Sequence, residues 1–145
     1  MIIIDKKKKN EILLISLEPI INLKKYDFFK IEIENRLMNF REDNDDKFIY
    51  KKEILMIIRN FLLDLRDLYL EKYNSNIEPP YIIPGPAHSI DVHWITNHYR
   101  LLINFPVDIS EEITVAGHKK RMDVIKLSTN PNNAVKLLLP WLNML

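Results

Sequence analysis

Apolar side chains recur every three or four residues between Tyr50 and Tyr73, a spacing that places them on one side of a helix. Charged residues fill the remaining surface of that helix. We therefore predict one long helix over residues 50–73 with a polar face toward solvent. The apolar positions are Ile54, Ile58, Phe61, Leu65, Leu68 and Tyr69, and the charged ones include Arg59, Asp64, Arg66 and Asp67.

Residues 26–41 fit two patterns, a helix and a strand. Their apolar residues have helical spacing over the whole segment, but in its middle they also alternate with charged residues, as in a half-exposed strand. We favour the helix, and we expect residues 11–23 to form a short helix or strand that breaks near Pro19. The residues at helical spacing are Phe29, Ile33, Leu37 and Phe40.

Residues 89–105 place apolar side chains at every second position of two segments, 90–94 and 99–105, which is typical of strands that bury one face. We predict a β-hairpin with Thr96-Asn97 as a two-residue turn, since Asn tolerates the positive φ that such turns need. The expected cross-strand pairs are Trp94 with Tyr99, Val92 with Leu101, Ile90 with Ile103, and His93 with Arg100.

Three further segments complete the expected fold. Residues 79–87 are rich in proline and predict an extended, stiff crossing, in which Gly85 supplies a turn with positive φ. Residues 112–118 and 122–128 alternate as two more strands. Asn130 followed by Pro131 is typical of a helix start, and Pro140 is expected to kink this last helix or end it early.

Together these elements predict an α+β fold in a single domain, residues 1–145. Residues 1–78 are mainly helical, residues 79–87 form the proline-rich crossing, and residues 88–145 hold a sheet and the last helix. The sheet is expected to be a four-stranded antiparallel meander over about residues 88–128, with the C-terminal helix packed on it. We expect Trp141 to cover the sheet beside Trp94.

Composition excludes several classes of protein. The 145 residues are 47% hydrophobic and 28% charged, as in a folded domain, and the net charge of +1 argues against a surface built entirely for nucleic acid. The chain has no cysteine, which excludes thiolate catalysis and disulfides. Its two glycines are too few for phosphate-cradling loops or dinucleotide turns.

Targeting signals are also missing from the pattern. The first residues place lysines after a short apolar run, the reverse of a secretory signal, and no apolar run approaches the roughly 20 residues that span a bilayer. We expect a cytoplasmic protein with no membrane association. The acidic segment 42–46 lacks the spacing, the glycine and the distal glutamate of a calcium loop, so we interpret it as a solvated turn.

The polar face of the predicted hairpin carries the best candidates for chemistry, Asp91, His93, His98 and Arg100. Ser89 adds a hydroxyl, but a hydrolytic triad needs histidine between nucleophile and carboxylate, and here Asp91 lies between the other two. An Asp–His pair on one strand suits general acid–base catalysis, and with another histidine it suits a metal. Arg100 opposite His93 argues against a dication, so no metal or other cofactor is expected.

A basic cluster, Lys119, Lys120 and Arg121, falls at the turn between the last two strands. Such a tip can hold a phosphate backbone, which keeps nucleic-acid contact open. The alternative is that these residues keep a strand end soluble and prevent edge pairing. Lysines 6–9 have the same two interpretations.

The hairpin also carries a resemblance. Ser89-Ile-Asp-Val-His-Trp94 followed by Leu101-Leu-Ile-Asn-Phe-Pro106 resembles a pattern in small uncharacterised bacterial proteins, in which a Gly-Ser-Ile-Asp-x-x-Trp strand precedes Leu-Leu-Ile-Asn-Ile-Pro. Here Ala87-His88 stands in place of the glycine, and the resemblance implies a shared fold without a mechanism. The order of helices, meander and helix also resembles the ubiquitin-conjugating-enzyme fold, whose catalytic cysteine this chain lacks.

These features lead us to expect a small protein that binds another macromolecule rather than an enzyme. Its size and missing catalytic signatures fit an accessory or immunity-type component of a bacterial toxin or phage-defence system. The alternative is a metal- or His/Asp-dependent hydrolase acting on nucleic acid or nucleotides, with His93 and Asp91 as its catalytic residues. The expected binding residues are Asp91, His93, His98, Arg100, Asn104, Lys119, Lys120 and Arg121.

Overall fold

The computed structural model of the chain describes residues 27–43, 48–119 and 122–143. The chain divides into two compact units, residues 1–31 and 32–145. The first unit contributes residues 27–31 to the description, where Asp27 Oδ1 accepts a hydrogen bond from the Lys30 backbone N–H at 3.1 Å and starts a helix. The arrangement discussed below is that of the second unit.

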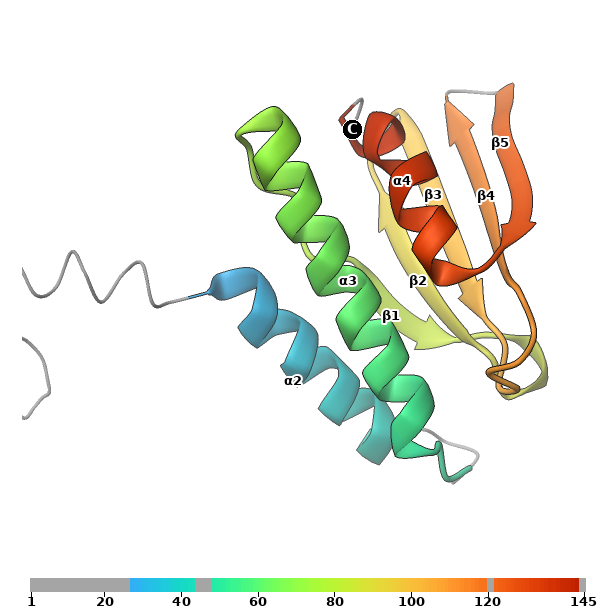
Figure 1. The fold of residues 1–145 in the computed structure, drawn as a ribbon. Coiled ribbons are helices and arrows are strands. Elements are labelled where there is room, and N and C mark those ends of the chain that lie inside the picture. Colours follow the sequence, from blue (N-terminus) through green and yellow to red (C-terminus); the bar gives the residue numbers. More distant parts are fainter. Residues whose placement is uncertain (1–26, 44–47, 120–121, 144–145) are drawn as a thin grey trace, which may run out of the picture. The chain divides into compact units, whose positions relative to one another are not determined.

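Helices precede and follow a run of strands, as the alternation pattern predicts (Figure 1). The α+β class is therefore confirmed. The helices are α2 (Phe28–Asp43), α3 (Lys52–Tyr73), the short 3-10 helix η1 (Pro86–His88) and α4 (Pro131–Leu142). The strands are β1 (Tyr81–Pro84), β2 (Ile90–Ile95), β3 (Tyr99–Phe105), β4 (Ile113–Lys119) and β5 (Met122–Thr129).

The five strands form one antiparallel meander in the order β1-β2-β3-β4-β5. We predicted four strands, and the additional one, β1, comes from the proline-rich segment. Tyr81–Pro84 pairs with residues 90–93 of β2, and as an edge strand it tolerates Pro84, which has no N–H to donate. The predicted extended conformation is therefore confirmed from Tyr81 to Gly85, with Tyr81–Pro84 in the sheet, but it is wrong for Pro86 and Ala87, which lie in η1.

The β2–β3 hairpin has a different register from the predicted one. Ile95 lies opposite Arg100, and Trp94 opposite Leu101. The backbone N–H of Thr96 donates to the Tyr99 carbonyl at 2.8 Å, and Thr96 Oγ1 accepts from the Tyr99 N–H at 3.0 Å. These bonds make Asn97 and His98 the turn, one residue later than predicted, and neither has a positive φ.

Moving a turn by one residue moves the pairing by two, which leaves every side chain on its predicted face. The core face of the hairpin is therefore as predicted, although the partners across it are wrong. Val92 pairs with Ile103 and Ile90 with Phe105, and all four are buried.

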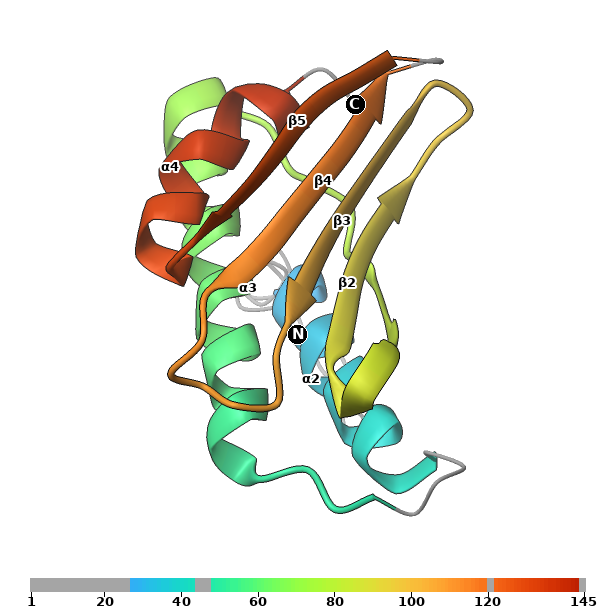
Figure 2. The same cartoon turned by 90° about the vertical axis from the view of Figure 1, so that its right-hand side faces the viewer.

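In the part of the chain that the structure describes, helices cover one face of the sheet and none lies over the other (Figures 1 and 2). Helix α3 contacts the covered face through Phe61, whose ring meets that of Phe105 edge-on at 5.4 Å between centroids. The part of α2 from Glu32 onward is tied to α3 by an ion pair between Glu34 and Arg59, 2.8 Å between Oε2 and Nε. Side chains on the face that these helices do not cover are not packed against them, so that face is available for a binding or catalytic site.

Helix α4 closes the other half of the covered face. It begins as predicted, because Asn130 Oδ1 accepts a hydrogen bond from the Asn133 N–H at 2.9 Å. Pro140 lies inside the helix without ending it, since α4 continues to Leu142. The Trp141 ring covers Gly117 of β4.

Candidate functional site

The uncovered face of the sheet, which we call the open face, is the surface toward the viewer in Figure 2. Cross-strand pairing arranges its side chains in three rows that run across the strands. The first row holds Ile83, Asp91, Asn104, Thr114 and Ser128. The second holds Tyr81, His93, Leu102, Ala116 and Lys126, and the third begins with Ile95, Arg100 and His118.

The first row contains a hydrogen-bonded network centred on Asn104. Its Nδ2 atom donates to Ser89 Oγ and to Asp91 Oδ1, both at 2.7 Å. Ser89, which is buried, donates in turn to the Pro86 carbonyl at 2.6 Å. A short polar chain therefore ties β3 to β2 and to the loop that precedes β2.

That loop carries the most unusual backbone among the described residues. Ala87 and His88 have φ values of 54° and 61°, in the left-handed region that residues with a side chain enter at a cost. Gly85 has φ −110°, so the positive φ that we predicted for it is wrong. A glycine is required at position 85 because a side chain would have no room: a Cβ there would lie 2.5 Å from Ser89 Oγ and 2.9 Å from Asp91 Oδ1.

His93 lies in the second row, between Tyr81 of β1 and Leu102 of β3. Its Nε2 atom is buried and has no hydrogen-bond partner among the described residues. Burial lowers the pKa of His93 below its usual 6.5, and the charge of Arg100 lowers it further, while Asp91 acts in the opposite direction. The folded protein therefore favours the neutral imidazole.

The predicted pairing of Arg100 with His93 is wrong, because the shifted register places Leu102 opposite His93 and Arg100 opposite Ile95. Asn104, rather than Arg100, stands opposite Asp91. The Asp91 carboxylate is consequently held by a neutral amide. Our argument against a metal assumed that Arg100 lies opposite His93, so that argument no longer applies.

A metal site would need additional ligands beside Asp91 and His93. Within residues 27–43, 48–119 and 122–143, no group of three or more His, Asp or Glu side chains is placed to hold a metal ion. His88, in the loop before β2, stacks on Phe48 with 4.0 Å between ring centroids. Asp91 and His93 remain an adjacent carboxylate and imidazole on one strand.

Basic groups gather where the open face meets the β2–β3 turn. His98, Arg100 and His118 line a shallow hollow of about 290 Å³. Lys119, in contrast, pairs with Tyr99 and so belongs to the face of buried Leu101, opposite to the open face; it lies over the Tyr99 ring, 5.7 Å from its centroid. Lys120 and Arg121, which we named as binding candidates, lie outside the described residues. Of the predicted basic cluster, Lys119 is thus the member that the structure places.

Sequence reasoning identified Asp91, His93 and Asn104 but missed how they are connected. The signals for the missing parts were present: Ser89 precedes the strand on the same face as Asp91, and one of only two glycines precedes it by four positions. The pair Ala87-His88, standing in place of the glycine of the resembling pattern, marked the strained backbone. Pairing alone could join Asn104 to this group.

None of the helices in the described part of the chain combines the length and the apolar character that crossing a bilayer requires. Comparisons of the chain with known protein families, curated proteins and solved structures found no match.

Proposed function

We propose that this protein binds another protein through the open face of its sheet, and that the partner presents an acidic surface. Such a role fits an accessory or immunity-type component of a bacterial toxin or defence system. The observation that carries the proposal is a five-stranded sheet with the described helices on one face (Figure 2) and, by strand register, a mixture of apolar, polar and basic residues on the other.

The chemistry of the open face resembles that of protein interfaces. Apolar side chains from four strands are interspersed with groups that form hydrogen bonds, and Tyr81 and Ile95 keep 59% and 48% of their surface exposed. Tyrosine and arginine, which dominate binding energy in many interfaces, are both present on or beside this face. The apolar members are Tyr81, Ile83, Ile95, Leu102 and Ala116.

Charge favours an acidic partner. Arg100 and Lys126 project from β3 and β5, and in the described residues neither has an ion-pair partner. Asp91, the carboxylate described on this face, is already held by Asn104. Complementary charge on the partner would accelerate association and set its orientation.

A protein partner is favoured over nucleic acid by the same arrangement. A carboxylate in the first row would repel a phosphate backbone, and the apolar side chains between the cations suit a protein surface. The proposal therefore commits to an acidic protein and treats nucleic acid as an outcome of the test.

The test places a photo-crosslinking residue, p-benzoylphenylalanine, at exposed Thr114 on the open face. Leu137 on α4, with 48% of its surface exposed, is the matched control position. In the native cell, we expect one protein adduct from position 114 and none from position 137. The partner is then purified, and its binding to the wild-type chain is measured by calorimetry.

Charge reversal distinguishes a specific contact from chance proximity. Arg100→Glu combined with Lys126→Glu should weaken binding of the purified partner at least tenfold, while Lys136→Glu on α4 should change it less than twofold. Equal adducts from both positions, or unchanged affinity after reversal, would overturn the proposal. Tight binding of a 20-nucleotide DNA or RNA that is lost on reversal would replace it with a nucleic-acid role.

The hydrolase alternative keeps one observation in its favour, the buried and unpartnered Nε2 atom of His93 beside Asp91. A neutral imidazole is the form that can accept a proton. His93→Ala should abolish turnover of a nucleotide or RNA substrate if this alternative is correct. If purified wild-type protein turns over neither substrate, or the variant retains the rate, the alternative is wrong.

A further inference from the structure

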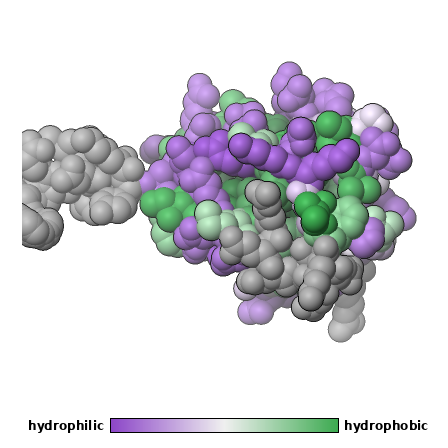
Figure 3. All heavy atoms as spheres, turned by 90° about the horizontal axis from the view of Figure 1, so that it is seen from below, coloured by the Kyte–Doolittle hydropathy of each residue, from purple (hydrophilic) through white to green (hydrophobic). Residues whose placement is uncertain are grey.

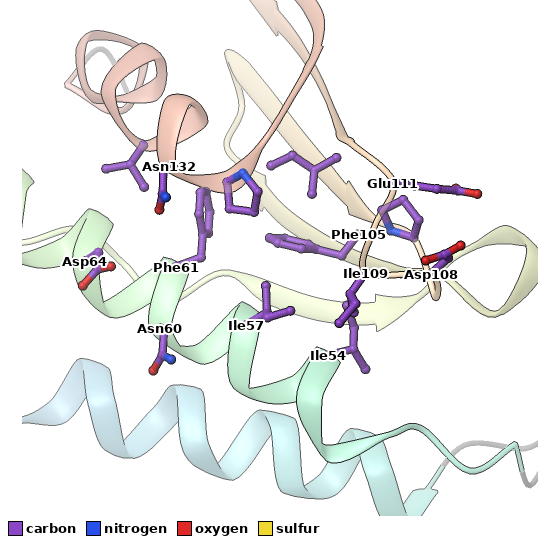
Figure 4. Close-up of a pocket in the computed structure, with 14 residues that line it drawn as sticks. Ile54, Ile57, Asn60, Phe61, Asp64, Phe105, Asp108, Ile109, Glu111 and Asn132 are labelled. Carbon is purple, nitrogen blue, oxygen red and sulfur yellow. The ribbon is translucent and has the colours of Figure 1, made fainter.

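A second hollow lies away from the open face, between α3, α4 and the loop that joins β3 to β4 (Figure 4). Its volume is about 300 Å³, at the small end of the range for binding pockets. Phe61 and Phe105 meet edge-on within it, and Ile54, Ile57 and Ile109 extend the apolar lining. None of these apolar residues belongs to the proposed interface.

Acidic side chains lie at both ends of this hollow. Figure 4 shows Asp64 of α3 at one end and Asp108 with Glu111, from the β3–β4 loop, at the other. The described residues that line it include no Lys or Arg, although Lys51 acts on Asp108 through its charge. Apolar surface rimmed by polar or charged groups is typical of interaction sites.

The acidic loop is held in place by its own hydrogen bonds. Asp108 Oδ1 accepts from the Ser110 N–H at 2.9 Å and from Ser110 Oγ at 2.7 Å. These bonds lower the pKa of the Asp108 carboxyl, so it stays charged well below neutral pH. Ile109 in the same loop nevertheless keeps 55% of its surface exposed.

Figure 3 shows the molecule from below the view of Figure 1. Hydrophobic side chains lie at this surface among hydrophilic ones. Val107 and Ile109, in the β3–β4 loop, are 43% and 55% exposed. Ile109 lines the hollow, so a ligand there would remove part of its apolar surface from water, which favours an occupant with an apolar side chain.

We propose that the hollow lined by Phe61, Phe105 and Ile57 binds a peptide segment of a partner that carries a bulky apolar side chain with a basic residue on either side. The apolar side chain packs beside Ile57 and Ile109, over the floor of the hollow where the two phenylalanine rings meet. The basic residues reach Asp64 at one end and Asp108 at the other. This surface is separate from the open face, so it would be a second binding site.

Size and charge together select this occupant. A volume of about 300 Å³ admits one large side chain rather than a helix laid in a groove. Acidic groups at both ends exclude phosphates and favour cations. A peptide places cations on both sides of one apolar group, whereas a simple amine satisfies only one end.

The test uses the peptide acetyl-Lys-Ala-Leu-Ala-Lys-amide with the full chain, followed by ¹⁵N NMR. We expect amide shifts confined to residues at the hollow, such as Ile57, Phe61 and Ile109, and a Kd between about 10 µM and 1 mM. Replacing Leu with Gln, or both Lys with Glu, should abolish the shifts. Shifts centred elsewhere, or none at 2 mM peptide, would show that the proposal is wrong.

Charge-neutral variants of the chain complete the experiment. Asp64→Asn combined with Asp108→Asn removes the charge at one end and one of the two charges at the other, where Glu111 remains, and the amide oxygen at position 108 can still accept from Ser110. We expect this pair to weaken the peptide at least threefold, and Glu71→Gln, on α3 outside the hollow, to leave the Kd unchanged. Equal affinity for the double variant, or equally tight binding of hexylamine alone, would overturn the assignment.

Discussion

Asn104 and Asp91 stand opposite each other on β3 and β2, with 2.7 Å between the amide Nδ2 and the carboxylate Oδ1. The same amide also donates to Ser89. Replacing Asn104 with Asp exchanges this donor for a second negative charge. We expect Asn104→Asp to lower the free energy of unfolding by about 1–3 kcal/mol at pH 7, measured by urea denaturation.

The loss should shrink as the pH falls, because protonating one of the two carboxyls relieves the repulsion and restores a donor. Asn39→Asp on the exposed side of α2 is the matched control, with an expected change within about 0.5 kcal/mol. A loss that is the same at pH 4.5 and pH 7 would contradict the repulsion that we infer.

Gly85 is held against the same network by lack of space. A Cβ there would lie 2.5 Å from Ser89 Oγ and 3.0 Å from Asn104 Nδ2, although the backbone itself suits alanine. We expect Gly85→Ala to cost about 1–3 kcal/mol in unfolding free energy and to move the NMR signals of the Asn104 side-chain amide. Ala87→Gly, in the same loop, should instead stabilise the protein by about 0.5 kcal/mol because it relieves a φ of 54°. Opposite signs for the two variants are the outcome to check.

His93 should make stability depend on pH. Because its pKa is lowered in the folded state, the unfolded chain binds a proton first as the pH falls below 6.5. The folded protein therefore loses stability below that pH, until the pH passes the lowered folded pKa. In urea denaturation from pH 7.5 to 5, the free energy of unfolding of the wild type should fall relative to that of His93→Gln. A constant difference across this range would contradict the shift.

Gly117 makes room for Trp141 under the sheet. A Cβ on Gly117 would lie 3.1 Å from Trp141 Cη2 and 2.6 Å from Ile125 Cγ2. We expect Gly117→Ala to lower the unfolding free energy by about 1–3 kcal/mol, because neither neighbour can withdraw without disturbing α4 or β5. Ala116→Val, the neighbouring position on the open face, should change it by less than about 0.5 kcal/mol. Equal effects of the two substitutions would contradict the inference that Trp141 and Ile125 leave no room for a side chain at position 117.

Trp141 illustrates what periodicity can predict. The apolar positions of α4 mark a buried side, and the expectation that Trp141 covers the sheet is confirmed by its place over Gly117, while its position beside Trp94 stays a prediction. The same reasoning located α3 and favoured a helix for α2, because the local spacing of apolar residues indicates a helix that is buried on one side. The strand β1 was missed, since two prolines before it and one inside it conceal a short edge strand.

The sequence predicted which residues belong to the candidate site but not how they are arranged. Alternation correctly placed Asp91, His93 and Asn104 on the face away from the core. It could not show that Asn104 bonds to Asp91, because that contact depends on which residues of two strands are opposite. The acid-rimmed hollow was not foreseen at all, since its lining comes from α3, α4 and a loop that are distant in sequence.

By itself the sequence determined α2, α3 and α4, the four longer strands and most of the side chains that they bury, because helical and strand periods of apolar residues report burial directly. Only the tertiary structure decided the pairing. Registers that differ by two residues bury identical faces, so the pattern does not distinguish Arg100 from Leu102 as the partner of His93. The bonds between Thr96 and Tyr99 select one register, and with it the neighbours of every group in the site.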